Sequence, residues 1–151
     1  MKELTAILET LANHFSQFEK QNTNISNGSV GWHCEHSLRV IIGVLETLAK
    51  ANPEEYKWAF NWKRSLILFK GKIPRGKAKS PKHVLPVGEI SDEKLLKLLA
   101  ESKRLISHFD EMPPNVFFKH PFFGLLNKKA TARFLYIHTK HHSDIINDIL
   151  C

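Results

Sequence analysis

The sequence predicts an all-α fold, a four-helix bundle with one additional short helix and a basic irregular loop. Apolar residues recur every three to four positions in several long segments, which is typical of amphipathic helices. Polar residues that commonly cap helices stand before most of these segments. No segment shows the alternation of apolar and polar residues that is typical of a half-buried strand. Four long apolar stripes are most simply buried against one another, so we expect a bundle.

The first half of the chain is expected to hold three helices. Residues 2–20 and 31–49 carry helical periodicity, and the polar residues 22–29 between them are expected to form a loop. The second of these helices is rich in aliphatic residues, which predicts burial on more than one side. The run Asn52-Pro53-Glu54-Glu55 is a typical helix start, so we expect a third helix from there to about Phe69.

The second half begins with an irregular segment, because glycine and proline interrupt residues 70–90 six times. Ser91-Asp92-Glu93 then opens a leucine-rich helix that extends toward Phe109. Residues 110–126, with three prolines and a glycine, are expected to be an irregular connection. Asn127 is expected to cap a final helix that runs nearly to the end of the sequence. The length fits a single domain spanning residues 1–151.

The charge of the protein is concentrated in one segment. The 151 residues include 22 Lys and Arg and 15 Asp and Glu, a formal charge of +7. Eight of the basic residues and no acidic one lie in residues 63–82, so the rest of the chain has 14 basic and 15 acidic residues. The eight are Lys63, Arg64, Lys70, Lys72, Arg75, Lys77, Lys79 and Lys82.

Three interpretations of this basic segment remain open. It is a solvated loop, a patch that follows nucleic-acid phosphates, or a lid that attracts an anionic substrate. Nucleic acid is the less favoured partner, because residues 71–81 contain no aromatic side chain for base stacking and the remaining surface is near neutral.

Membrane and secreted classes are not expected. The longest strongly apolar run is far shorter than the roughly 20 residues that span a bilayer. Glu3 and Glu9 interrupt the region where a signal peptide would be apolar. We therefore expect a cytoplasmic protein with no membrane partner, in which Cys34 and Cys151 are free thiols.

Two histidines of the final helix lie on the side that should face the core. At about 100° per residue, His138 and His142 fall at the centre of the apolar stripe, and His141 falls at its edge. Histidines at positions i and i+4 can hold one divalent metal ion, although the glutamate of an HExxH zinc helix is missing here. The alternative is a pair of core histidines hydrogen-bonded to other groups. The stripe consists of Phe134, Leu135, Ile145 and Ile149.

A further histidine pair lies early in the second helix. His36 shares a face with Trp32, His33 lies about 60° away from it, and Cys34 points almost opposite. A third core-facing histidine on another helix favours a metal, because three imidazoles leave an open position on zinc or a similar ion. Cys34 is expected to be a small packed thiol.

Three motifs resemble those of the DinB/YfiT-like superfamily of metal-binding four-helix-bundle proteins, and more narrowly a branch of it without an assigned activity. They are Gly31-Trp32-His33-Cys34-Glu35-His36, His120-Pro121-Phe122-Phe123-Gly124 and His138-Thr139-Lys140-His141-His142. The resemblance covers essentially the whole chain in helix count and order.

The resemblance implies a metal bound by His36, His138 and His142, the set that the helical faces select independently. It also implies zinc or nickel as the metal, a homodimer, and activities such as hydrolysis or thiol S-transfer. Four further residues are expected around the ligands or at the mouth of the site: Trp32, His33, His120 and His141.

The leading hypothesis is therefore a metal-dependent hydrolase or thiol S-transferase acting on a small substrate. Under the lid interpretation of the basic segment, this substrate is anionic. No general acid or base can be named from the sequence. The first alternative is a non-catalytic binding or interaction bundle, and the second is nucleic-acid binding through residues 63–82.

Overall fold

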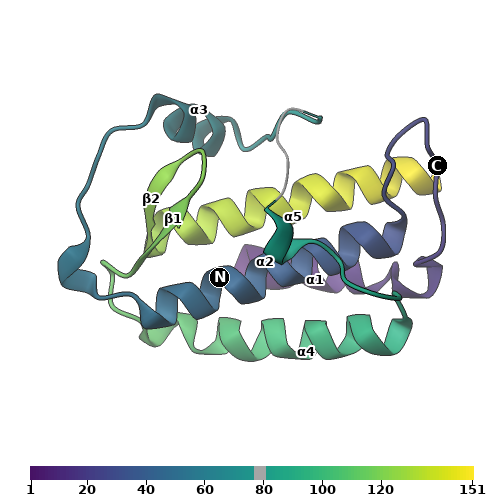
Figure 1. The fold of residues 1–151 in the computed structure, drawn as a ribbon, viewed down its shortest axis with the longest axis horizontal. Helices are drawn as coiled ribbons and strands as arrows, with labels where there is room; N and C mark the ends of the chain where they lie inside the picture. Colours follow the sequence, from purple (N-terminus) through teal and green to yellow (C-terminus); the bar gives the residue numbers. More distant parts are fainter. Residues whose placement is uncertain (77–80) are drawn as a thin grey trace.

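The four long helices pack together as a bundle in the computed structural model, which describes residues 1–76 and 81–151 (Figure 1). α1 and α2 each pack against both α4 and α5. Leucine, isoleucine, valine and phenylalanine side chains from all four helices form the core between them. The predicted bundle is therefore observed in the described part of the chain. Its helices are α1 (Lys2–Ala12), α2 (Val30–Lys50), α4 (Asp92–Ser107) and α5 (Lys128–Leu150).

The first helix is shorter than residues 2–20. α1 ends at Ala12, and a 3-10 turn follows at Phe15–Gln17. The chain then turns toward the start of α2, where the amide of Gly31 donates to the carbonyl of Phe18 over 2.8 Å. A Cβ at Gly31 would lie 2.9 Å from the Phe18 carbonyl oxygen, so this close approach requires glycine. Such contacts between distant segments are invisible to helical periodicity.

α2 matches its prediction closely. Ser29 caps it by accepting a hydrogen bond from the amide of Trp32 over 3.2 Å. Buried residues occupy most of its circumference along the first half, as the aliphatic composition predicted.

The predicted helix from Asn52 to Phe69 is wrong in its first half. Asn52 caps only a 3-10 turn at Pro53–Glu55, and the helix α3 spans Trp62–Lys70. The side chain of Asn61 restarts the helix by accepting from the amide of Arg64 over 2.9 Å. The Arg64 side chain binds the carbonyls of Ala59 and Leu125, which holds the preceding segment in a non-helical path.

The connection before the last helix is a β-hairpin, so the all-α prediction is wrong at this point. β1 (Phe117–His120) pairs antiparallel with β2 (Gly124–Asn127). Phe118 and Leu126 lie opposite each other and are both buried in the core. Strands of four residues are too short for their alternation to stand out from the surrounding sequence.

The segment between α3 and α4 is irregular in its described part, apart from a 3-10 turn at Lys82–Val84. The basic residues Lys77 and Lys79 lie outside the described residues. Asn127 caps α5 as predicted, accepting from the amide of Ala130 over 3.0 Å. Among residues 1–76 and 81–151, no helix combines the length and the apolar character needed to cross a membrane.

Candidate metal centre

α2 and α5 bring together the three histidines that the helical faces select. His36 lies in the first half of α2, and His138 and His142 are one turn apart on α5. One ring nitrogen from each lies within 4.8 Å of the others. The rings of His36 and His142 have centroids 4.8 Å apart, and those of His138 and His142 are 4.7 Å apart. This group is close enough to hold a metal ion.

The orientation of His36 is set by a backbone carbonyl. Its Nδ1 donates to the carbonyl oxygen of Val84 over 2.8 Å, and because a carbonyl only accepts, Nδ1 carries the proton. In the neutral ring the lone pair is then on Nε2. Trp32 stacks on the same ring at a centroid distance of 5.0 Å. This arrangement matches that of metal-binding histidines, whose second nitrogen donates to a carbonyl or carboxylate.

His142 is held by a second histidine. Its Nδ1 lies 2.8 Å from Nδ1 of His33, and Nε2 of His33 lies 2.9 Å from Oγ of Ser26. If His142 uses Nε2 as a ligand, its Nδ1 donates to His33, which in turn donates to Ser26. Each polar atom in this series of hydrogen bonds then has a partner of the correct type.

His138 has a polar atom that the protein leaves unsatisfied. Its Nδ1 is buried and has no hydrogen-bond partner in the part of the chain that the structure describes. A buried polar group left without a partner costs about 1–3 kcal/mol. A metal ion at the cluster would give His138 a bond through one of its nitrogens. The three imidazoles therefore fit a metal in their chemistry, and a metal bond through Nδ1 of His138 would also satisfy this atom.

Burial keeps these rings uncharged. Desolvation lowers the pKa of His138 and of His142 well below the ordinary value, and neighbouring histidines lower both further. Burial lowers the pKa of His36 as well, and that of His33 to about 4. Neutral imidazoles have the lone pairs that a metal requires.

The other predicted residues surround the cluster. His33 contacts His142 and Trp32 stacks on His36, and the ring of His141 lies 5.2 Å from that of His142. His120 ends β1 and has a structural role, since its Nδ1 accepts from the amide of Phe122 over 3.1 Å. It is nevertheless near enough to lower the pKa of His138.

Two residues between α3 and α4, Arg75 and Val84, reach the site. Arg75 pairs with Asp148 on α5 over 2.7 Å, and its charge lowers the pKa of both His33 and His141. Val84, further along the segment, supplies the carbonyl that binds His36. Arg75 of the basic segment therefore lies near the histidines, and the lid interpretation stays a prediction. The Cys34 thiol is a fully buried packed group, and burial raises its pKa to about 12.

Sequence reasoning missed Val84, Ser26 and the buried Glu35. Val84 acts through its backbone, so no side-chain pattern indicates it. Glu35 is fully buried and binds Arg39 over 2.7 Å and Lys94 over 2.9 Å. A charged residue inside an apolar helical stripe was the available signal for Glu35.

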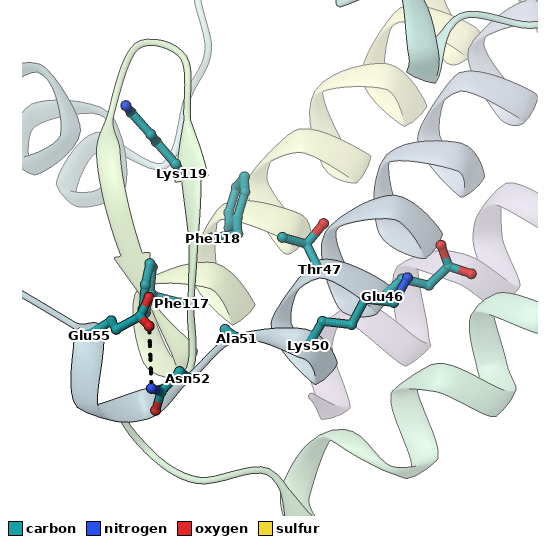
Figure 2. A pocket seen from close by; sticks show the side chains of 9 residues that line it. All are labelled: Glu46, Thr47, Lys50, Ala51, Asn52, Glu55, Phe117, Phe118 and Lys119. Atoms are coloured by element: carbon teal, nitrogen blue, oxygen red, sulfur yellow. Dashed lines mark hydrogen bonds between the residues drawn. The ribbon is translucent and has the colours of Figure 1, made fainter.

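A separate open hollow of about 420 Å³ lies between the C-terminal half of α2 and β1 (Figure 2). Lys50 and Glu46 line one side, and Phe117, Lys119 and Glu55 line the other. No histidine contributes to it. His36 is ten residues before Glu46, about 15 Å along the helix, so this hollow is distinct from the histidine cluster.

Comparisons of the chain with protein-family models, with curated proteins and with solved structures find no match. What the site can do therefore follows from its own chemistry: three neutral imidazoles, a stacked tryptophan and a nearby arginine.

Proposed function

We propose that the protein binds one divalent metal ion, zinc or nickel, through His36, His138 and His142, and that it acts on a small substrate at the remaining coordination position. Membership of the DinB/YfiT-like superfamily is part of this proposal. The bundle and the position of the three histidines on its helices support it. The homodimer that the resemblance implies stays a prediction.

The observation that carries the proposal is the convergence of one ring nitrogen from each of His36, His138 and His142 within 4.8 Å, together with the unsatisfied Nδ1 of His138. Core histidines that serve only packing are expected to satisfy their nitrogens with protein partners. Nδ1 of His36 and Nδ1 of His142 each have a hydrogen-bond partner, whereas Nδ1 of His138 has none in the described part of the chain.

A divalent metal held by the three histidines would supply Lewis acidity, which activates a water or thiol for hydrolysis or thiol transfer. The chain contributes the surroundings. Trp32 forms an apolar wall against His36, and Arg75 adds positive charge beside His33 and His141. This charge favours an anionic substrate.

Cobalt tests the open position. Co²⁺ added to the metal-free protein should give a visible absorption spectrum typical of low coordination. We expect 2-mercaptoethanol, and separately inorganic phosphate, to shift that spectrum in a saturable manner. A cobalt spectrum that neither probe alters would contradict an open position and leave a closed structural site.

The non-catalytic alternative has one observation in its favour. Among the described residues, the charges that shift the pKa of His138 and of His142 come from other histidines, and no carboxylate is among them. Saturable binding of both probes without any hydrolysis of a panel of activated esters and phosphate esters would favour this alternative.

A further inference from the structure

Residues 58–69 expose five large apolar side chains, which we call the apolar strip: Trp58, Phe60, Trp62, Leu66 and Phe69. Trp58 is 70% exposed and Phe69 is 87% exposed. The strip begins before α3 and continues along it, on the outside of the bundle beyond the hairpin (Figure 1). Single exposed apolar residues are ordinary, but a group of this size indicates a binding surface.

The outward direction of the strip is built into the packing of α3. Trp62, Leu66 and Phe69 share one helical face, whereas Arg64 points inward and is only 8% exposed. The Arg64 guanidinium donates to the carbonyls of Ala59 and Leu125. Rolling the helix to bury its apolar face would strip this cation of its partners at a large cost. The strip is therefore held toward solvent.

Basic side chains accompany the strip. Lys57, Lys63, Lys70 and Lys72 are exposed and have no ion pair within the described residues. Lys63 lies 5.8 Å from the centroid of the Trp62 ring. No acidic residue occurs between residues 56 and 76. Two copies of this surface would repel each other, so the charge favours an anionic partner over a second copy.

We propose that the apolar strip and these lysines bind single-stranded nucleic acid. Its unpaired bases offer flat faces that stack on tryptophan and phenylalanine, and its phosphates attract lysine. In a duplex the base faces are covered by their neighbours, so a single strand is the better fit. Sequence reasoning disfavoured nucleic acid because residues 71–81 contain no aromatic side chain. The exposed rings lie instead at residues 58–69, directly before the basic loop.

The test uses fluorescein-labelled oligo(U) and oligo(dT) of about 20 nucleotides with the full chain, followed by fluorescence anisotropy. We expect saturable binding that quenches tryptophan fluorescence, because Trp58 and Trp62 stack on bases. Four phosphate contacts predict a slope of about −3 when the logarithm of the association constant is plotted against that of the salt concentration.

Two sets of variants separate stacking from charge. The variant Trp58→Ala/Trp62→Ala/Phe69→Ala should bind at least tenfold more weakly, because each stacked base contributes severalfold. The variant Lys63→Gln/Lys70→Gln/Lys72→Gln should reduce the magnitude of the salt slope from about 3 to about 1. Matched controls are Leu96→Ala, an exposed leucine on α4, and Lys2→Gln on α1; both should bind as the wild type does.

Circular dichroism of each variant will test whether it is folded, which is expected because the altered side chains are exposed. Three results would overturn the proposal. One is the absence of binding at 20 mM salt. Another is a wild-type dimer that the triple alanine variant abolishes, which would make the strip an interface between copies. The third is binding to phosphatidylserine vesicles with no binding to either oligonucleotide.

Discussion

His33 is the residue on which the orientation of His142 depends. It contacts His142 through Nδ1 and Ser26 through Nε2, so it links a candidate ligand to the loop before α2. Partners of this kind fix the tautomer and the direction of a metal-binding ring, and their loss typically costs 10–100-fold in metal affinity.

We therefore predict that His33→Phe, which keeps an aromatic ring but removes both nitrogens, weakens zinc binding by about 10–100-fold. Competition with a chromophoric chelator measures this change. His108→Phe, at an exposed histidine distant in sequence from the cluster, is the matched control and should bind zinc as the wild type does. Equal zinc affinities for His33→Phe and the wild type would mean that the hydrogen bond between His33 and His142 does not contribute to metal binding.

His120 should make stability depend on pH. Burial lowers its pKa from 6.5 to about 4 in the folded protein. Below pH 6.5 the unfolded chain therefore binds a proton that the folded chain does not, and stability falls as the pH falls toward 4. One histidine that is protonated only in the unfolded chain changes the free energy of unfolding by about 1.4 kcal/mol per pH unit. Here we expect about 1 kcal/mol per pH unit, because the ring of His120 is partly exposed.

The variant His120→Asn isolates this contribution, because an asparagine oxygen can still accept from the Phe122 amide but does not titrate. Urea unfolding in chelator at pH 7 and pH 5 should show a larger loss for the wild type than for the variant. If the wild type and the variant lose the same stability between pH 7 and pH 5, groups other than His120 cause the acid sensitivity.

At the scale of elements, Glu35 connects α2 to α4 and to the segment before it. Its Oε1 binds Arg39 and Lys94 and lies 3.4 Å from the amide of Val87. Removing one partner of a buried ion pair leaves an uncompensated charge, which costs about 3–5 kcal/mol in fully buried pairs. Arg39 and Lys94 are each about a quarter exposed, so the cost here is smaller.

Glu35→Gln should therefore lower the free energy of unfolding by about 2–3 kcal/mol in urea titrations. Glu93→Gln removes the exposed ion pair with Lys97 on the same α4 helix and should cause no measurable change. If both variants unfold at the same urea concentration, Glu35 does not hold these elements together.

The elements that the sequence predicts well have caps and long apolar stripes of their own. Ser29 and Asn127 mark the starts of α2 and α5, and both helices appear where expected. The failures occur where distant contacts decide the local structure. Arg64 binding to Leu125 stops a helix from forming through residues 56–61, and four-residue strands form the hairpin only because Phe118 and Leu126 reach the core.

The same distinction holds within the site. Helical faces selected His36, His138 and His142 because ring direction on a helix follows from spacing. The groups that orient the rings are not part of these faces. Ser26 contacts His33, and the carbonyl of Val84, 48 residues from His36, accepts from the His36 ring. No local pattern could indicate a backbone contact of that separation.

At the scale of the whole molecule, the excess positive charge lies in residues 63–82, which carry eight basic residues and no acidic one. Residues 57–72 carry the apolar strip and the exposed lysines, whereas Arg75 and Val84 lie beside the histidines. The two proposed functions therefore occupy neighbouring but separate surfaces, and the metal and the oligonucleotide should bind independently.

Metal binding should also stabilise the entire fold, because α2 and α5 both supply ligands. Zinc at 100 times its dissociation constant adds about 2.7 kcal/mol, which corresponds to a rise of roughly 5–10 °C in Tm for a chain of this length. Differential scanning calorimetry measures the shift. A Tm that zinc does not change would contradict a site formed between the two helices.

Metal content tests the central claim most directly. Protein purified without chelator and without nickel resin should contain about one equivalent of zinc or nickel by inductively coupled plasma mass spectrometry. The folded variant His138→Ala/His142→Ala should contain none. Wild-type protein that is metal-free and takes up no added zinc or nickel would contradict the claim, and the three histidines would then be packing residues.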